Sequence, residues 1–431
     1  MVLRFFWYPI AKCCLAQQCD KSYTRGVTTR FLQLAQNHAT GVALSDTTLR
    51  LVKFTQEGAM ALPEHAATIP VPEGAIENGR VVNKSKFITF LKTAKKIHRF
   101  DSINLVLISP LVQTFSISVK GAAPLYIKEA VEKMFGLPAK DILYEFHAIG
   151  GTSELTTFQV TTILKAVSQE FAACFKSAGI TVLTIDSIGH ALSRAVVPQG
   201  AHTSVMVVSV DTDITTLVIA VNGKVSQTTM FAFGTDAFNE ALVSALHVGT
   251  DEAKRLQREQ GLIGSNSKQV FDALADDCEA LARHINEEYI AWHTAHKALP
   301  PVEHIYLTGA GSTLNGLDEY LSIALRLPVD KANVWVNCLS FDEYVPTLSQ
   351  NEAADFGAAI GAVLVGNDSA NMLPGDHKQT LRRHHIMSVT AKVVLSFLFG
   401  MVVGFLVARI IVLPAVHAHL LALLHKIQAR W

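Results

Sequence analysis

The chain has 431 residues, of which 49% are hydrophobic and 17% charged, with Lys+Arg and Asp+Glu balanced at 37 each. This length has room for two or three domains, and the balanced charge gives no basic surface for nucleic acid, which is therefore not expected as a partner. Six cysteines without a Cys-x-x-Cys pair suit reduced thiols in a cytoplasmic body. The histidines lack zinc spacing, so no metal site is predicted.

Residues 1–30 contain a short apolar patch that Pro9 and Lys12 interrupt. The patch is too short to span a bilayer, and no small-residue cleavage site follows it. We therefore interpret residues 1–30 as an N-terminal extension and not as a signal peptide.

Two segments share a pattern of strand, polar turn and strand, over residues 41–54 and 204–225. Within the second segment, Asn222-Gly223 indicates a further hairpin turn. Helices are predicted to follow over residues 235–246 and 251–260. Because each hairpin opens one half of the body, the pattern indicates an internal duplication.

The segment between the two hairpins has its own pattern and is interpreted as an inserted α+β subdomain over residues 100–187. Its predicted elements are strands over 104–109, 114–119 and 182–186, and helices over 126–135 and 165–177.

A glycine-rich turn follows the apolar run 305–307 and precedes a predicted helix over 317–326. Its glycines are Gly309, Gly311 and Gly316. Closely spaced glycines let backbone N–H groups approach an anion, and a helix N-terminus adds partial positive charge. The turn therefore predicts either a phosphate site or a tight strand–helix connection.

Residues 393–413 form an apolar stretch with one charge, Arg409. A helix of this length would cover about 31 Å, the thickness of the hydrocarbon core of a bilayer. More basic residues precede the stretch than follow it, which favours a cytoplasmic N-terminal side. We predict a single transmembrane helix, followed by an amphipathic external tail over 414–431.

Small residues recur at every fourth position of the predicted span and would lie on one helix face. This strip suits close packing of two helices, although glycine is also common in membrane helices generally. Self-association through the strip is therefore one of two open interpretations, and its residues are Ser396, Gly400, Gly404 and Ala408.

The paired hairpins, the late glycine turn and a final helix over 355–364 resemble the actin and heat-shock-chaperone ATPase fold. More narrowly, Val-Pro-Glu-Gly-Ala-Ile-Glu-Asn-Gly-Arg-Val-Val at 71–82 and Ile-Asp-Ser-Ile-Gly-His-Ala-Leu-Ser-Arg-Ala-Val at 185–196 resemble the PilM family of type IV pilus assembly, which is similar to FtsA. The resemblance covers residues 31–366. It implies a duplicated actin-like (ribonuclease H-like) α/β fold with an inserted subdomain, followed here by one transmembrane helix.

The resemblance implies that ATP lies between the two halves, where each hairpin usually carries Asp-x-Gly for magnesium and phosphate. Here the first hairpin has Ala43 and Ser45 at those positions, and the second has Ser209 and Asp211. The nucleoside-facing helix positions are Lys254 and Gln257, and the implied nucleotide residues are Gly309, Gly311, Gly316, Asp211, Asp213 and Thr215.

These replacements weaken a magnesium–nucleotide site. Magnesium needs carboxylate and phosphate oxygens around it, and phosphoryl transfer needs the metal. We therefore expect no catalytic residue, no useful hydrolysis, and at most weak binding of ATP and Mg²⁺ as cofactors. A register shift of one or two residues would return Asp211 or Asp213 to the metal position, so binding itself stays open.

Residues 367–392 connect the body to the predicted span and contain Asn371, Met372, Leu373 and Pro374, with Arg382 and Arg383 after them. This order resembles the start of the PilN family, an Asn-Leu-Leu-Pro-like peptide before a membrane helix, which PilM proteins bind in a groove. The resemblance implies a docking peptide held by the chain's own body. A short tether raises its local concentration to roughly millimolar. The alternative is a plain polar linker.

Three functions compete on this sequence. The favoured one is an inner-membrane scaffold or adaptor of a type IV pilus or related secretion machine, with its body in the bacterial cytoplasm. Its partners would be PilN/PilO-like membrane components and cytoplasmic motor or platform proteins. The alternatives are an active actin-like ATPase or sugar kinase, and an FtsA-like division protein.

Overall fold

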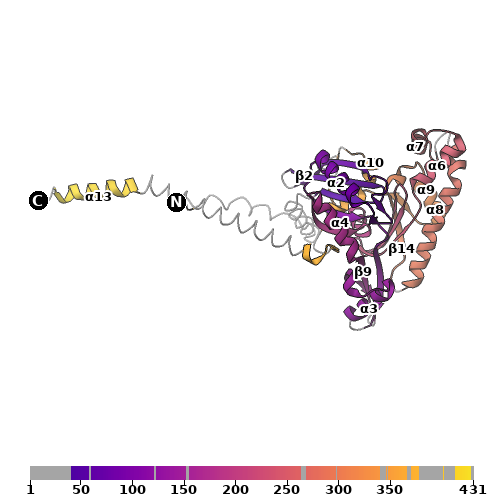
Figure 1. Ribbon diagram of the computed structural model, residues 1–431, viewed down its shortest axis with the longest axis horizontal. Helices are drawn as coiled ribbons and strands as arrows, with labels where there is room; N and C mark the ends of the chain where they lie inside the picture. The colour runs from indigo at the N-terminus through magenta and orange to yellow at the C-terminus, as the bar shows by residue number, and fades with distance from the viewer. Residues whose placement is uncertain are drawn as a thin grey trace, which may run out of the picture. The chain divides into compact units, whose positions relative to one another are not determined.

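The computed structural model describes residues 40–57, 60–120, 123–151, 155–263, 268–297, 299–339, 346, 348–365, 370–377, 401 and 413–428. The chain divides into two units, Met1–Leu373 and Pro374–Trp431. The described strands all belong to the first unit, and α13 (Leu413–Gln428) belongs to the second (Figure 1).

A five-stranded sheet with the order β10-β6-β1-β2-β3 forms the first half of the body. β1, β6 and β10 are parallel, whereas β1, β2 and β3 form an antiparallel meander. Phe87 of α2 lies edge-on to Phe171 and Phe175 of α4, so the two helices pack together. The bounds are β1 (Thr40–Leu44), β2 (Thr48–Glu57), β3 (Met60–Pro70), β4 (Ile76–Glu77), β5 (Arg80–Val81), α2 (Lys84–His98), β6 (Ser102–Leu107), α4 (Lys165–Ser177) and β10 (Thr181–Ser187).

An eight-stranded sheet with the order β15-β14-β11-β12-β13-β7-β9-β8 contains the second half. Helix α8 runs beside α6 and α9 (Figure 1), and these helices share a buried apolar cluster with β11, β12 and β14. The bounds are β11 (Ser204–Val210), β12 (Thr215–Val221), β13 (Lys224–Phe231), α6 (Thr235–Leu246), α7 (Thr250–Glu259), α8 (Lys268–Ala295), β14 (Val302–Thr308), η2 (Ala310–Thr313), α9 (Leu317–Leu325), β15 (Val329–Lys331) and α10 (Gln350–Ala354).

The two predicted hairpins are confirmed. β1 pairs antiparallel with β2, and β11 pairs antiparallel with β12. Asn222 and Gly223 have φ angles of 51° and 72°, as a two-residue hairpin turn requires. The helix predicted over 235–246 coincides with α6. The duplication inferred from the sequence is therefore present as two antiparallel hairpins, one in each sheet.

The inserted segment is smaller than the predicted 100–187. The strand predicted over 104–109 is β6, which pairs with β1, and the strand over 182–186 is β10, which pairs with β6. Both therefore belong to the first sheet. The prediction missed this because a short apolar run indicates a strand but does not specify which strand it pairs with. The insertion consists of β7 (Val112–Val119), α3 (Ala123–Phe135), η1 (Ala139–Asp141), β8 (Ile142–Gly151) and β9 (Thr156–Leu164).

Helices α5 (Ile188–Val196) and α11 (Gly357–Val363) share one buried cluster with strands of both sheets. A Cβ atom at Gly361 of α11 would collide with the carbonyl oxygen of Ala191 in α5. A Cβ atom at Gly41 of β1 would collide with the carbonyl oxygen of Ala359. Helix α11 thus lies at backbone contact distance from both α5 and β1.

The second unit contains α13, which confirms the predicted tail helix and begins at Leu413. Pro414 lies in its first turn, where a missing N–H leaves no helical hydrogen bond unmade. Within the described part of the chain, no helix is long and apolar enough to cross a bilayer. The predicted span 393–413 lies outside the described residues except for Met401 and Leu413, as do Ser396, Gly400, Gly404, Ala408 and residues 1–30.

We predict that Gly361→Ala lowers the free energy of unfolding by about 1–3 kcal/mol, because the new methyl group must displace helix backbone. Gly357→Ala is the matched control in the same helix, since its Cβ would meet Leu192, Thr308 and Val334 at 3.4 Å, an ordinary contact distance. Urea denaturation of both variants measures the difference. Equal stabilities would contradict the close approach of α5 and α11.

Candidate functional site

Acidic side chains occupy the turns of both hairpins. The Gly79 backbone N–H donates to both carboxylate oxygens of Asp46, at 3.0 Å to Oδ1 and 3.2 Å to Oδ2. Burial raises the pKa of Asp46, and the nearby charge of Asp213 raises it further. Asp213 is exposed, whereas Asp211 is buried at the end of β11. The two turns therefore place negative charge close together.

One buried cation, Arg50 of β2, lies between two carboxylates that come from other elements. Its Nη2 is 2.9 Å from Asp355 Oδ1, and its Nη1 is 3.5 Å from Asp211 Oδ1. The exposed fractions of these side chains are 4% for Arg50, 8% for Asp211 and 24% for Asp355. We call these three residues the Arg50 cluster. It connects the first sheet to the end of β11 and to the residue that follows α10.

The Asp211 carboxyl is the most perturbed group of the Arg50 cluster. Burial raises its pKa to about 6, and Arg50 offsets only part of that effect. The negative charge of Asp355 raises the pKa further, whereas the hydrogen bond that Ser209 Oγ donates to Asp211 Oδ2 at 3.2 Å lowers it. Arg50 is shared with Asp355, which is the closer partner, so Arg50 only partly offsets the effect of burial on the Asp211 pKa.

The glycine turn packs against β11. Gly309 has φ 82°, and a Cβ atom there would lie 2.6 Å from the Val210 carbonyl oxygen. A Cβ atom at Gly311 would lie 2.5 Å from Val210 Cγ1. Gly316, with φ 83°, precedes α9 and faces Ile263. The structure thus brings Gly309 and Gly311 beside the strand that ends at Asp211, and both glycines are required there for close packing.

Two other predicted nucleotide positions have their polar groups engaged within the protein. The buried Thr215 hydroxyl donates to the Phe233 carbonyl at 2.7 Å. The buried Gln257 amide donates to Asn239 Oδ1 at 2.9 Å. Lys254 is exposed and does not line the pocket described next. The side chain of α7 that does line the pocket is Arg258. The sequence interpretation named its neighbour, Gln257, and not Arg258.

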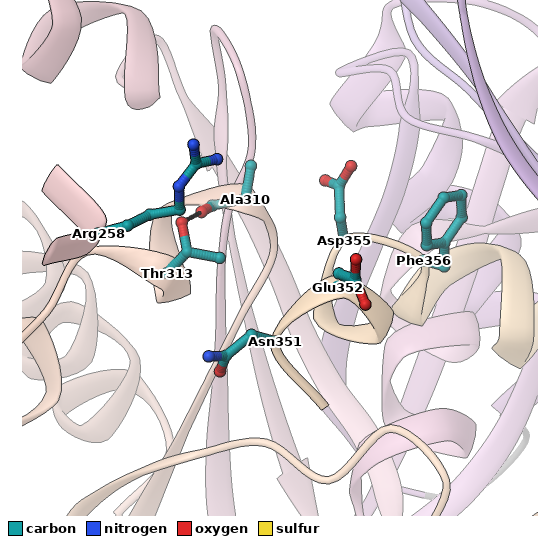
Figure 2. A pocket seen from close by; sticks show the side chains of 7 residues that line it. All are labelled: Arg258, Ala310, Thr313, Asn351, Glu352, Asp355 and Phe356. Carbon is teal, nitrogen blue, oxygen red and sulfur yellow. Dashed lines mark hydrogen bonds between the residues drawn. The ribbon is translucent and has the colours of Figure 1, made fainter. Parts of the chain in front are cut away.

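A pocket of about 400 Å³ lies beside the glycine turn (Figure 2). This volume falls within the usual range for small-molecule sites. Figure 2 shows Arg258 and Thr313 on one side and Asp355 and Phe356 on the other. The carboxylate of Glu352 is held by Ser349 in a capping box. The lining residues are Arg258, Ala310, Thr313, Asn351, Glu352, Asp355 and Phe356.

Asn371 lies against the edge strand β10. Its Oδ1 accepts from the Ile185 N–H at 3.3 Å, and its Nδ2 donates to the Leu183 carbonyl at 3.5 Å. The side-chain amide thus pairs with β10 as a backbone amide of an added strand would. The next residue continues the pairing, because the Met372 N–H donates to the Ile185 carbonyl at 2.7 Å.

Contacts from two further elements hold the same segment. We call residues 371–373 and the groups that contact them the peptide site. Ser168 of α4 donates to the Met372 carbonyl at 2.7 Å, and Glu145 of β8 accepts from the Asn371 N–H at 3.1 Å. Met372 and Leu373 are only 1% and 2% exposed. The second unit begins at Pro374, whose carbonyl accepts from the His377 N–H at 3.0 Å. Residues 371–373 are therefore fixed by backbone and side-chain contacts to β8, α4 and β10.

A buried ion pair lies next to the peptide site along the chain. Asp186, at the end of β10, is 2.6 Å from Arg194 Nη2 and 3.1 Å from His190 Nδ1. These partners hold the pKa of Asp186 below its usual value despite complete burial. Arg194 Nε also donates to the Gly361 carbonyl at 3.0 Å. This pair connects β10 to α5 and α11.

The two hairpin-bearing halves and the glycine turn between β14 and α9 define an actin-like protein. The profile of the type IV pilus assembly protein PilM matches residues 41–366, so the chain belongs to the PilM family. Family membership supports a role in type IV pilus assembly. No group of three His, Cys, Asp or Glu residues that could hold a metal ion occurs among the described residues.

Solved structures agree with this fold. A PilM–PilN type IV pilus biogenesis complex matches with a TM-score of 0.61 and 18% identity, over 76% of this chain and 98% of that one. The ethanolamine utilization protein EutJ from Carboxydothermus hydrogenoformans matches at 0.46 and 16%, over 79% and 99%. The cytoplasmic domain of EpsL from Vibrio cholerae matches at 0.37 and 11%, over 79% and 99%. The first likeness shows the fold.

We predict that the stability of the wild type falls relative to Asp211→Asn as the pH rises from about 4 to about 6. The folded pKa of Asp211 lies above the model value of 3.8, so the folded state holds this proton more tightly and loses stability as it dissociates. The relative change is of the order of 2–3 kcal/mol. Urea denaturation of both chains at pH 4.5 and 7 measures it.

Asp213→Asn is the matched control, because Asp213 is exposed and an exposed charge is screened by solvent. A relative stability of Asp211→Asn that does not change with pH would contradict the proposed environment of the Asp211 carboxyl.

Proposed function

We propose that this protein is an adaptor of type IV pilus assembly in which the body holds residues 371–374 as its own docking peptide. The observation that carries this proposal is the seating of Asn371 and Met372 on the edge of β10. Edge strands present unpaired N–H and C=O groups, and addition of an extended peptide is a common mode of recognition. The similar solved structure is named as a PilM–PilN complex, and we propose an association of that kind within one chain.

The chemistry of the peptide site favours an asparagine followed by an apolar residue. The amide of Asn371 offers one acceptor and one donor to β10, an arrangement that aspartate or leucine cannot reproduce. The burial of Met372 and Leu373 adds apolar area, at roughly 25 cal/mol per Å². A plain polar linker would have no reason to bury these two side chains, so the contacts favour the docking peptide over that alternative.

The proposed adaptor connects this body to the bacterial inner membrane through the predicted span 393–413, with the body in the cytoplasm. The support is the apolar composition of that stretch and the basic residues before it. PilN/PilO-like membrane components and cytoplasmic motor or platform proteins are the proposed partners. Self-association through Gly400 and Gly404 is an additional proposal.

We further propose that the body is not an enzyme and binds Mg-ATP weakly or not at all. Asp46, Asp211 and Asp213 bring negative charge to the turns that would face phosphates, and like charges repel. The hydroxyl of Thr215 and the amide of Gln257 already have partners within the protein. Arg258 is the cation that the pocket offers to a ligand. An ATPase or FtsA-like function remains the alternative.

Asn371→Ala should release the docking peptide and reduce piliation. The substitution removes the bonds of the Asn371 side chain to Ile185, Leu183 and Leu373, each worth about 0.5–1.5 kcal/mol. Hydrogen exchange of the Met372 and Ile185 amides in the full chain should accelerate by at least tenfold. Pilus counts of a strain that carries only the variant should fall.

Gly375→Ala is the matched control four residues along the chain, because a Cβ atom there meets nothing within 4 Å. Unchanged amide exchange in Asn371→Ala would contradict the role of the side chain. Accelerated exchange with normal piliation would show that the peptide docks but that docking does not serve pilus assembly.

Isothermal titration of the full chain with Mg-ATP should give no binding tighter than about 1 mM, and phosphate release should not exceed the buffer rate. The reason is the unfavourable charge around Asp46, Asp211 and Asp213. Turnover that is abolished by Asp211→Asn or Asp213→Asn would establish the ATPase alternative. Tight binding without turnover would refute only the predicted weakness of the nucleotide site.

A further inference from the structure

Arg50 stands directly opposite Ala43 in the register of β1 and β2. Directly opposite residues of an antiparallel pair point to the same face of a sheet. Position 43 is where the actin-like resemblance implies a metal-binding carboxylate. The chain therefore has a methyl group in place of that carboxylate and a cation on the neighbouring strand.

The Arg50 cluster gathers carboxylates that could not lie together without a positive charge. Asp211 follows β11 of the second half, and Asp355 precedes α11. The charge of Asp355 raises the cost of charging Asp211 and so raises the Asp211 pKa. A planar guanidinium contacts two carboxylates at once and stays charged at any physiological pH. Arg50 thus supplies the compensating charge from within the protein.

Two hydroxyl groups lie beside the ion pairs of Arg50, and the charge of Asp213 also acts on Arg50. Thr48 Oγ1 accepts from Arg50 Nη1 at 3.0 Å, and Ser209 Oγ lies 3.2 Å from Asp211 Oδ2. The Arg50 Nε atom is buried and has no hydrogen-bond partner among the described residues. Hydroxyl and carboxylate oxygens accept from a guanidinium and are also the ligands of hard divalent cations.

We propose that Arg50 replaces a divalent cation in this protein: it joins Asp211 and Asp355 to the first sheet without metal, and its removal creates a site for Mg²⁺, Mn²⁺ or Ca²⁺. The residue thereby determines which cation the interface between the two halves accepts. This role is separate from peptide docking, because the Arg50 cluster and the peptide site share no residue.

A merely structural ion pair would behave differently. The Arg194 side chain, which is 11% exposed, lies 2.6 Å from Asp186, and His190 lies 3.1 Å from the same carboxylate. Removing Arg194 leaves one carboxylate, which is too few oxygen ligands for a divalent cation. Removing Arg50 leaves two carboxylates and the hydroxyls of Thr48 and Ser209. Only the second change should produce a response to added cation.

The test uses the purified full chain and MnCl₂, with electron paramagnetic resonance to count bound Mn²⁺ and thermal unfolding with EDTA or Mn²⁺. Wild type should show no specific Mn²⁺ binding and no shift in Tm. Arg50→Ala should unfold roughly 5–10 °C lower in EDTA, as expected for a lost buried partner. It should bind about one Mn²⁺ per chain, at least tenfold more tightly than wild type, and regain half or more of the lost Tm.

Two controls complete the design. Arg194→Ala should lose stability in EDTA and regain none with Mn²⁺, and Arg50→Ala/Asp211→Asn should bind no Mn²⁺. Arg50→Gln, which removes the charge but keeps a shorter hydrogen-bonding side chain, replaces Arg50→Ala if that variant does not fold in EDTA.

Several outcomes would overturn the proposal. Wild type that binds Mn²⁺ as tightly as Arg50→Ala would show that the cation site exists beside the arginine. A folded Arg50 variant without specific Mn²⁺ binding, or with no greater recovery than Arg194→Ala, would show an ordinary structural ion pair. Failure of both Arg50 variants to fold even with Mn²⁺ would equally refute replacement by metal. Folding only with Mn²⁺ would support it.

Discussion

The close packing of α11 against β1 and α5 is the constraint on which the body depends. Gly41 and Gly361 permit backbone contact on both sides of this short helix, where any Cβ atom would collide. The position of α11 fixes Asp355, which precedes it, and the Gly361 carbonyl, which accepts from Arg194. The Arg50 cluster and the Asp186 ion pair are therefore anchored to one helix, although they serve different parts of the protein.

The edge of β10 is the surface on which Asn371 and Met372 lie. β10 is the last strand of the five-stranded sheet, and its outer edge offers the backbone groups of Leu183 and Ile185. An uncovered edge invites association with other chains. Asn371 and Met372 satisfy those groups, and Glu145 from β8 fixes the peptide from the inserted segment. The peptide thus connects the first sheet to the insertion.

The sequence predicted local structure well because hairpins and helices depend on nearby residues. Alternation and Asn222-Gly223 were sufficient for β11, β12 and the following turn. The sheet that β6 and β10 join was not predictable, because parallel partners lie far apart in sequence and a short strand does not specify its partner. The burial of Arg50 was also not predicted, because an arginine in a strand is normally expected to be exposed. Its contacts with Asp211 and Asp355 explain why it is buried.

The charges of the two sites suit different tasks. Around Arg50 the protein satisfies its own carboxylates, so a ligand would have to displace an existing ion pair and recover its desolvation cost. At β10 the contacts are hydrogen bonds to backbone groups and apolar burial, and one carboxylate, that of Glu145, accepts from the Asn371 N–H. The halves of the body are thus joined internally, whereas residues 371–373 lie on an outer sheet edge. This arrangement is consistent with the proposed adaptor role, whereas a nucleotide-driven clamp must separate its halves for product to leave.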